Sequence, residues 1–213
     1  MALEEFKTSA DGIEMHLAAC HIGHFLLTGL LLPQLQASPA ARVVTLTSTG
    51  YEASDFRFDD WNFSDGEAYD RWLAYGQAKT ANIMFTNELA RRAAASESSK
   101  NIAAFVLHPG FVLASGIMSN VSMDALTEAL EQSKAAHAAE GREFTPEQPK
   151  SIEQGCATML VAALRPDLEK QAGAFLRDCQ VVSPDDLKPY ARDQEKAEKL
   201  WGLSEELVKE KFL

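Results

Sequence analysis

The sequence predicts an α/β fold with a parallel sheet. Two short apolar runs rich in β-branched residues, 42–48 and 101–107, are typical of buried strands. Each run ends in a polar turn, and segments with helical periodicity lie before, between and after the two runs. Strands that alternate with helices in this way favour a parallel sheet covered by helices. There is no internal repeat or low-complexity tract, so we expect one domain over residues 1–213.

Composition and charge limit the classes of function. With 213 residues, 46% of them hydrophobic, the chain can bury one sizeable core. Its net charge of −11 argues against nucleic acid and against an anionic membrane surface as partners. We recognise no signal peptide and no apolar run long enough to span a membrane. The three cysteines, Cys20, Cys156 and Cys179, form no C-x-x-C pair, which predicts reduced thiols in a cytoplasmic protein.

The first predicted element is one long helix that ends near Pro33. Ser9 or Asp11 is the candidate N-cap, with Glu14 three residues after Asp11. Residues then recur at spacings of three and four, as expected of one helix face: Ile13, Leu17, Cys20, His24, Leu27 and Leu31. Further leucines make the segment apolar nearly all round, so we expect it to be buried under other elements.

The strand predicted at 42–48 ends in the hydroxyl-rich sequence Thr47-Ser48-Thr49-Gly50. In open α/β sheets, ligands bind at the carboxyl ends of the strands. The stretch 51–73 that follows is irregular and rich in aromatic residues. A loop of this length commonly belongs to a functional site, and its aromatic residues can also form a small core of their own.

The second predicted helix, 75–92, begins with a tyrosine and a lysine four residues apart, Tyr75 and Lys79. Residues at this spacing lie on one face of a helix. An ammonium beside a phenol lowers the pKa of the phenol, which would make Tyr75 a general acid or base near neutral pH. The same spacing also occurs by chance, as a surface tyrosine stacked on the aliphatic part of a lysine.

The strand predicted at 101–107 leads into the turn His108-Pro109-Gly110. The variable region that follows, 111–150, includes a weakly amphipathic helix over 122–139 and a loop with two prolines. This region is the candidate for a mobile lid over a substrate.

A third helix is predicted to begin after Ser151, which forms a capping box with Gln154. Its predicted apolar face consists of Cys156, Met159, Leu160 and Ala163. A short strand at 173–176 and two charged helices, 193–200 and 204–212, complete the expected order of elements.

Taken together, the strand ending in Thr47-Ser48, the Tyr75-x-x-x-Lys79 pair and the Pro109-Gly110 turn resemble the short-chain dehydrogenase/reductase family. The match is closest to the branch that is similar to retinol dehydrogenases and to the WW-domain oxidoreductase. That branch shows runs like Gly23–Thr28, Lys79–Thr86, His108-Pro109-Gly110 and Leu200–Ser204. The resemblance covers nearly the whole chain. It implies the C-terminal portion of a Rossmann-like, doubly wound parallel sheet, with three to four strands and flanking helices.

The resemblance also implies roles for individual residues. Ser48 matches the serine that hydrogen-bonds the substrate oxygen, and Tyr75 matches the proton donor or acceptor. Lys79 matches the lysine that lowers the pKa of this tyrosine and holds the nicotinamide ribose. The implied cofactor is NADP or NAD, and the implied reaction interconverts a carbonyl and an alcohol.

Further residues match the family around the nicotinamide. Pro109 and Gly110 match the turn beside the ring, and Val112 matches the residue whose backbone contacts the carboxamide. Ala114 stands where the family often has serine or threonine, and Ser115 would serve there if the loop shifted by one residue.

The sequence departs from the family pattern at its beginning. Met1-Ala2 aligns just after the family's Asn-Asn-Ala-Gly turn, and the chain contains no G-x-x-x-G-x-G sequence. The resemblance therefore implies that the first half of the fold, which holds the dinucleotide, is missing. The strand 42–48 would then lie at an open sheet edge. The chain would cover this edge itself, or pair it with another copy or a partner.

Cys20 stands where the family usually has an asparagine that kinks the helix and supports the proton relay to the lysine. A thiol is a weak substitute for an amide, so we expect Cys20 to be a small buried residue rather than a reactive thiol. Three nearby histidines, His16, His21 and His24, lack the further ligands of a metal site, and we expect no metal.

Three hypotheses about function remain. In the first, the chain is an NADP- or NAD-dependent oxidoreductase that acts on a hydrophobic small molecule. In the second, the same tyrosine, lysine and serine catalyse an isomerisation, dehydration or cyclisation without a cofactor. In the third, the chain is a non-catalytic homologue that acts by association through its exposed sheet edge, with itself or with a relative.

Overall fold

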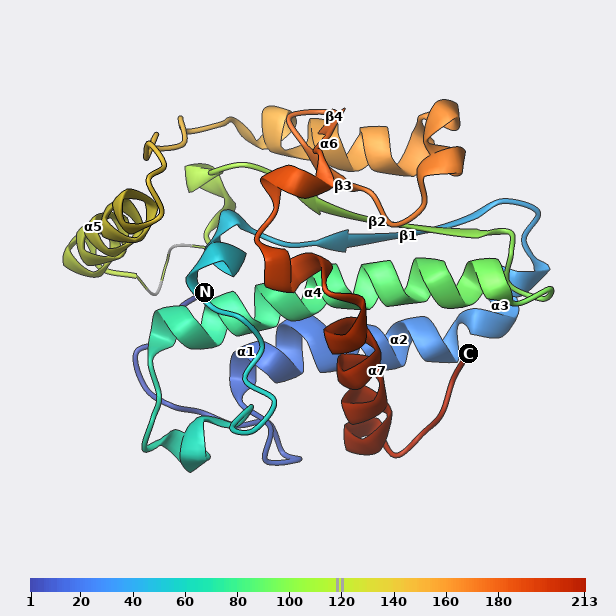
Figure 1. Cartoon of the computed structure of the whole chain (residues 1–213), viewed down its shortest axis with the longest axis horizontal. Coiled ribbons are helices and arrows are strands. Elements are labelled where there is room, and N and C mark those ends of the chain that lie inside the picture. The colour runs from blue at the N-terminus through green and yellow to red at the C-terminus, as the bar shows by residue number, and fades with distance from the viewer. Residues whose placement is uncertain (118, 120) are drawn as a thin grey trace.

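The sheet contains four strands in the order β1-β2-β3-β4 (Figure 1). β1 (Ala41–Leu46) pairs in parallel with β2 (Ile102–His108), which pairs in parallel with β3 (Phe175–Arg177). The short β4 (Gln180–Val181) pairs antiparallel with β3. The predicted α/β class and the three to four strands are confirmed, whereas the antiparallel turn into β4 was not predicted.

This arrangement is a computed structural model that describes residues 1–117, 119 and 121–213. Two positions of the predicted lid, Met118 and Asn120, lie outside the described residues.

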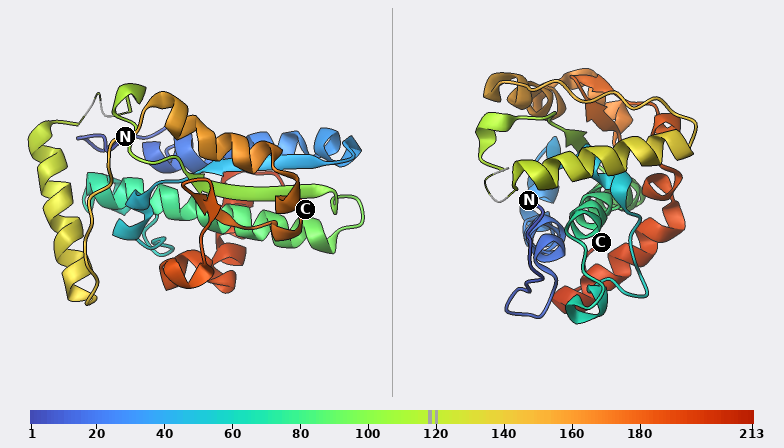
Figure 2. Two further views of the ribbon diagram at one scale, coloured as in Figure 1. Left: turned by 90° about the horizontal axis from the view of Figure 1, so that it is seen from above. Right: turned by 90° about the vertical axis from the view of Figure 1, so that its left-hand side faces the viewer.

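Helices cover both faces of the sheet, as Figures 1 and 2 show. The long helix α4 (Arg71–Ala95) lies under one face, with α2 (Gly23–Leu30) beside it. On the other face lies α6 (Ile152–Leu164). The C-terminal helix α7 (Gln194–Val208) packs against α4 on the side away from the sheet.

The first helical run differs from the single long helix that was predicted. It consists of α1 (Met15–Leu17), a π-helical turn (Ala18–Ile22), α2, and then α3 (Leu32–Ala37). Its N-cap is Glu14, whose carboxylate accepts the backbone N–H groups of the first turn, so the prediction of Ser9 or Asp11 is wrong. Pro33 does not end the run, because it sits in the first turn of α3, where its missing N–H costs nothing.

The burial predicted for this run is only partly correct. Phe25 and Leu32 are buried, but Leu27, Leu30 and Leu31 are 54%, 55% and 44% exposed. An apolar segment predicts burial, but which of its faces is covered depends on elements elsewhere in the chain.

The helix predicted at 75–92 begins four residues earlier than expected. Asp70 caps α4 by accepting the backbone N–H groups of Trp72 and Leu73, an interaction worth about 1 kcal/mol. Tyr75 therefore lies inside the helix rather than at its start. Most of α4 is buried, which fixes its position beneath β1 and β2.

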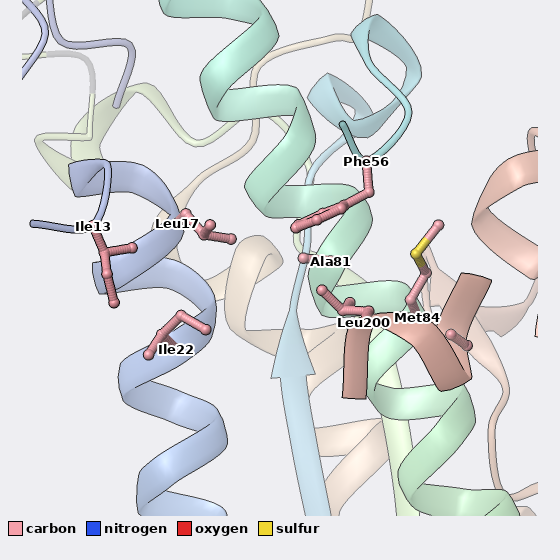
Figure 3. Packing of buried hydrophobic residues seen from close by; sticks show 8 residues of the cluster. Ile13, Leu17, Ile22, Phe56, Ala81, Met84 and Leu200 are labelled. Atoms are coloured by element: carbon pink, nitrogen blue, oxygen red, sulfur yellow. The ribbon is translucent and has the colours of Figure 1, made fainter. Parts of the chain in front are cut away.

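One hydrophobic cluster of the core contains side chains from the first helical run, the loop after β1, α4 and α7. Figure 3 shows side chains from these elements turned toward one another. Its members include Ile13, Leu17, Ile22, Phe56, Ala81, Met84 and Leu200. The aromatic loop 51–73 therefore builds core, since Phe56 and Phe63 are also buried.

α6 begins with the predicted capping box between Ser151 and Gln154, which is confirmed. Its predicted apolar face is partly wrong. Gly155, Thr158 and Ala162 are the buried positions, while Leu160 is 58% exposed and Ala163 is exposed as well.

The two charged helices predicted at the C-terminus are one helix, α7. Gly202 does not interrupt it, because Leu200, Trp201 and Ser204 bury one continuous face against the rest of the molecule. The chain then ends with Phe212 and Leu213 packed beside α2 and α4.

The helix predicted at 122–139 is confirmed as α5 (Met123–Ala139), capped by Ser122. It stands at one end of the molecule, apart from the sheet (Figure 1). None of the helices in the described part of the chain combines the length and apolar character needed to cross a bilayer.

Candidate active site

The carboxyl end of β1 is tied to α4 by hydrogen bonds from both elements. The Thr47 hydroxyl donates to the backbone carbonyl of Lys79 over 2.8 Å. In return, the Asn82 amide donates to the carbonyl of Leu46 over 2.9 Å, and the Lys79 ammonium lies 3.4 Å from the same oxygen. These contacts fix the turn of α4 that follows Tyr75 against the strand end that carries Ser48.

Two glycines let the loop after β1 lie directly on α4. A Cβ at Gly50 would lie 2.8 Å from Cε1 of Tyr75, and a Cβ at Gly76 would lie 2.8 Å from the carbonyl oxygen of Gly50. The backbone N–H of Gly50 donates to the Ser48 hydroxyl over 3.1 Å. Ser48 and the Tyr75 phenol are thereby held next to each other at the carboxyl edge of the sheet.

Burial governs the acidity of Tyr75, which is 5% exposed. Burial raises the pKa of Tyr75 to about 12, a hydrogen bond from Ser48 acts in the opposite direction, and the nearby Cys20 thiol raises it further. The Lys79 ammonium lies 5.6 Å from the centroid of the Tyr75 ring. The expected lowering of this pKa by Lys79 is therefore wrong, and the phenol is protonated at neutral pH.

The Tyr75 ring also meets a buried carboxylate–histidine pair that the sequence did not reveal. The His16 ring meets Tyr75 edge-on, with 6.0 Å between centroids. His16 Nδ1 lies 2.7 Å from the Glu14 carboxylate, and His16 Nε2 accepts the backbone N–H of Leu3 over 3.2 Å. A Glu-x-His spacing is too common to have signalled this pair.

The three histidines near Cys20 serve separate contacts. Besides His16, His21 Nε2 lies 2.8 Å from the Ser204 hydroxyl, and burial lowers the pKa of His21 to about 3. His24 Nδ1 lies 2.9 Å from the carbonyl of Cys20. Cys20 itself is only partly buried, in the π-helical turn. Among the described residues, no three potential ligands are grouped as a metal site.

The turn after β2 reaches the same edge of the sheet, because Leu46 of β1 pairs with Leu107. Gly110 has a φ of +88°, and the Lys150 side chain occupies the space where its Cβ would lie. Lys150 forms an ion pair with Asp178. Pro109 and Gly110 are partly exposed beside this lysine.

Val112 and Ser115 lie farther along the chain, where Val112 packs against the helix on the other face of the sheet. Val112 packs close to Gly155 of α6, where a Cβ would lie 2.6 Å from Cγ2 of Val112. Ser115 is exposed and donates to the carbonyl of Val112 over 2.7 Å. The structure therefore brings Ser48, Tyr75 and Lys79 together, and it places Val112 against α6, with the Ser115 hydroxyl bonded to Val112.

Contacts of charged and histidine side chains attach the end of α5 and the segment after it to the loop that follows Ser48. Arg142 lies 3.1 Å from the Glu52 carboxylate, and His137 lies 3.7 Å from it. Glu147 lies 2.8 Å from Nε2 of His108 at the end of β2. These contacts place the predicted lid beside the candidate site, and its movement stays a prediction.

The hollows that the described residues form on the surface include two of about 420 and 300 Å³. The first lies between the N-terminal segment, the start of α4 and the start of α5, and it is lined by Glu4, Arg71 and Asp124 among others. The second lies at the amino ends of β1 and β2. Neither is lined by Ser48, Tyr75 or Lys79.

No protein-family profile matches the chain, but curated proteins and a solved structure do. Retinol dehydrogenase 12 of Mus musculus is 36% identical over 203 residues, which is 95% of this chain and 57% of that protein. Retinol dehydrogenase 14 of Homo sapiens is 34% identical, again over 95% of this chain and over 54% of that protein. The short-chain dehydrogenase/reductase prx1 of Penicillium roqueforti is 37% identical over 96% of this chain and 58% of that protein.

One similar structure is a crystal structure of an uncharacterized protein from Mycobacterium paratuberculosis. It is 30% identical, with a TM-score of 0.63, and the match covers 100% of this chain and 65% of that one. The chain thus spans a little more than half the length of the curated relatives it matches. Identity of this level over nearly all of its residues shows that the chain belongs to the short-chain dehydrogenase/reductase family.

Proposed function

We propose that this chain carries the proton-transfer site of an oxidoreductase that interconverts a carbonyl and an alcohol. The observation that carries the proposal is the meeting of Ser48 from the end of β1 with Tyr75 and Lys79 from α4. The curated relatives named as dehydrogenases support the same reaction type.

In the direction of reduction, Tyr75 donates its phenolic proton to the carbonyl oxygen of the substrate. Its raised pKa keeps the phenol protonated at neutral pH, with roughly one molecule in 10⁵ ionised at pH 7. The Ser48 oxygen accepts the Gly50 N–H, and its own hydrogen, which bonds to the Tyr75 oxygen in this structure, would turn to the same substrate oxygen. Ser48 then stabilises the negative charge that develops there.

Lys79 lies at the site and is the candidate to bind the nicotinamide ribose. Its ammonium is in contact with the Leu46 carbonyl at 3.4 Å, which leaves donors for a ribose hydroxyl. Bound NADP or NAD would supply the hydride. The residues present fit the nicotinamide half of the cofactor, since the Pro109-Gly110 turn follows the strand next to Ser48. The G-x-x-x-G-x-G turn that holds the cofactor pyrophosphate in the family is absent from the 213 residues.

An apolar substrate is favoured by the side chains of the variable region. Leu113 and Ile117 are 51% and 46% exposed close to Val112, at the carboxyl side of the sheet. We infer that these aliphatic side chains would line a pocket for a hydrophobic ligand. The names of the relatives, retinol dehydrogenases, agree with this substrate class.

The proposal is tested with the purified chain and NADPH or NADH at millimolar concentration. Binding raises the thermal midpoint, and reduction of an aromatic aldehyde consumes the cofactor. Tyr75→Phe should abolish the reduction while keeping the thermal shift, whereas Tyr69→Phe, outside the site, keeps both. If neither cofactor shifted the thermal midpoint, the chain alone would not bind NADPH or NADH.

A second candidate is proton transfer without a cofactor, as in an isomerisation, dehydration or cyclisation. It is favoured by the presence of Ser48, Tyr75 and Lys79 in a chain without a glycine-rich turn. Turnover of an enolisable ketone by cofactor-free protein, lost in Tyr75→Phe, would favour it.

A third candidate, a non-catalytic role by association, is favoured by the burial of Tyr75.

A further inference from the structure

A carboxylate and a histidine are buried together beside Tyr75, and the proposed proton transfer uses neither of them directly. Glu14 is 0% exposed and His16 is 5% exposed. Burial of polar groups costs free energy unless each group finds hydrogen-bond partners. An apolar side chain at position 16 would avoid this cost. What the polar pair adds is a set of directional bonds.

Hydrogen bonds at both ring nitrogens fix the orientation of the His16 ring. Nε2 accepts the backbone N–H of Leu3 over 3.2 Å. Because a backbone N–H can only donate, the ring hydrogen of His16 sits on Nδ1. Nδ1 then donates to the Glu14 carboxylate over 2.7 Å. The ring can therefore neither flip nor tilt without breaking one of these two bonds.

The Glu14 carboxylate is itself held by the backbone around it. Its two oxygens accept the N–H groups of His16 and Leu17 over 3.0 and 2.9 Å. The N–H of Glu14 donates to the side chain of Asn62 over 2.8 Å. The carboxylate thereby ties the His16 ring to the start of the first helical run and to the loop after β1. All of these partners belong to the chain itself.

The ring of Tyr75 touches two groups that restrict its position. The His16 ring meets it edge-on, with 6.0 Å between centroids and 78° between the ring planes. The backbone of Gly50 lies close to its Cδ1–Cε1 edge. The phenol oxygen, at the far end of the ring, accepts the hydrogen bond from Ser48. A small rotation of the ring would therefore carry this oxygen away from Ser48.

We propose that Glu14 and His16 are positioning residues for Tyr75, which hold its ring in the orientation in which the phenol oxygen meets Ser48. His16 acts by direct contact with the ring, and Glu14 acts through His16. Neither residue touches the substrate or exchanges a proton with it. The inference rests on the proposed function, in which Tyr75 transfers the proton.

Nuclear magnetic resonance of the full chain, labelled with ¹³C at tyrosine Cζ, tests this orientation without a substrate. The chain has four tyrosines, and Tyr75→Phe identifies the Tyr75 signal. Ser48→Ala should shift this signal, because the phenol loses a hydrogen bond. In a His16→Ala background the same substitution should shift it by less than half as much. His16→Gln should restore the full shift, since its amide can donate to Glu14 and accept from Leu3.

The matched control is His21→Ala, which removes another buried histidine of the same helical run. His21 is 1% exposed, and its ring meets Phe25 and Phe85. Its loss should destabilise the fold and leave the effect of Ser48→Ala on the Tyr75 signal at its wild-type size. The proposal is overturned if His16→Ala leaves this effect unchanged, or if His21→Ala reduces it equally.

Steady-state kinetics with an aromatic aldehyde and NADPH separate this inference from the proposed function. His16→Ala should lower kcat about tenfold or more and keep KM within about threefold, because a small misplacement of a catalytic group slows the chemical step. His16→Gln should recover kcat. A wild type without activity would refute the proposed function, and the Tyr75 signal would still decide the role of His16. An active wild type whose kcat is unchanged in His16→Ala would refute the positioning role.

Two further measurements decide the question if His16→Ala does not fold. His16→Leu fills the space without hydrogen bonds, so it should reduce the effect of Ser48→Ala in the same way. In the wild type, nuclear Overhauser effects should connect the ring hydrogens of His16 and Tyr75, and the ¹⁵N shift of His16 Nε2 should be that of a nitrogen without hydrogen. Absence of the Overhauser effects, or a hydrogen on Nε2, would contradict the geometry on which the proposal stands.

Discussion

The ring of Tyr75 lies against the backbone of Gly50, so closely that a single added methyl group would lie 2.8 Å from Cε1 of the ring. This contact sets the distance between the strand end that carries Ser48 and the helix that carries Tyr75. No other residue type has a side chain small enough for this position.

Gly50→Ala should therefore destabilise the protein by about 1–3 kcal/mol, because the ring or the loop must move to admit the new methyl group. Gly50 does not have a positive φ, so the effect is steric. Urea unfolding measures it. The control is Gly202→Ala on α7, where a Cβ meets nothing within 4 Å and alanine favours the helix. Equal stabilities of the two variants would contradict the contact.

Tyr75 should titrate at about pH 12, well above an ordinary tyrosine. The ultraviolet absorbance of tyrosinate, taken as the difference between the wild type and Tyr75→Phe, reports this single group. Ser48→Ala should move the titration to higher pH, because the Ser48 hydrogen bond lowers the pKa of Tyr75. A Tyr75 that titrates near pH 10 in the folded protein would disprove its burial.

The same raised pKa links Tyr75 to stability. The folded state holds the phenolic proton more tightly than the unfolded state, so this contribution is complete below pH 10 and is lost as the pH rises toward 12. Burial also raises the pKa of Tyr51 to about 12, so both groups favour unfolding in that window.

The C-terminal tail should be coupled to α2 through Phe212. Its ring fills the space beside Gly29, where an added Cβ would overlap the ring. It also meets Phe25 edge-on, at 5.6 Å between centroids. Phe212→Ala and Gly29→Ala should each destabilise the protein, by about 1–3 kcal/mol.

A double-mutant cycle isolates this contact. The combined Gly29→Ala and Phe212→Ala variant should lose clearly less stability than the two single variants together, since the truncated ring makes room for the new methyl group. Strict additivity in thermal or urea unfolding would show that the tail does not occupy this position.

The ionised Glu88 carboxylate should stabilise the folded protein at neutral pH and lose this effect in acid. Burial alone would raise the pKa of this carboxyl group, but hydrogen bonds from Arg91, Arg92 and Gln194 outweigh it, and the pKa is lowered. The stabilisation is therefore present above the ordinary value near 4.5 and is lost as the pH falls through the folded pKa. Glu88→Gln should be less stable than the wild type at pH 7, with the difference shrinking below pH 4.5.

The matched control is Glu131→Gln, which alters an exposed carboxylate of α5 by the same change. Its stability should follow that of the wild type across the acid range. A difference for Glu88→Gln that stays constant with pH would mean that the charge of Glu88 is not involved.

Local signals predicted much of the fold. β1 and β2 followed from β-branched apolar runs, and the start of α6 followed from the capping box of Ser151 and Gln154. These signals involve residues close in sequence, so they can be recognised in a single amino-acid sequence. The meeting of Ser48 with Tyr75 was predicted from the family resemblance rather than from spacing.

Long-range burial could not be predicted in the same way. The acidity of Tyr75 depends on how deeply the first helical run and the loop around Gly50 enclose it, and the Tyr75–Lys79 spacing alone suggested the opposite shift. The continuity of α7 through Gly202 depends on the buried face around Trp201. The exposure of Leu27 and Leu30 depends on which neighbours are present, and the segment itself reads as buried.

The three candidate site residues have one topological property with consequences for folding. Ser48, Tyr75 and Lys79 all lie in the unit formed by β1, α4 and β2, a succession of strand, helix and parallel strand that is continuous in sequence. Hydrogen bonds from Thr47 and Asn82 close this unit internally. These bonds need no residue of α5, α6 or α7, so we expect the site to form together with this unit. In native-state hydrogen exchange, the amides of α4 and β2 should belong to the last cooperative group to open, and the site should persist in partly unfolded forms.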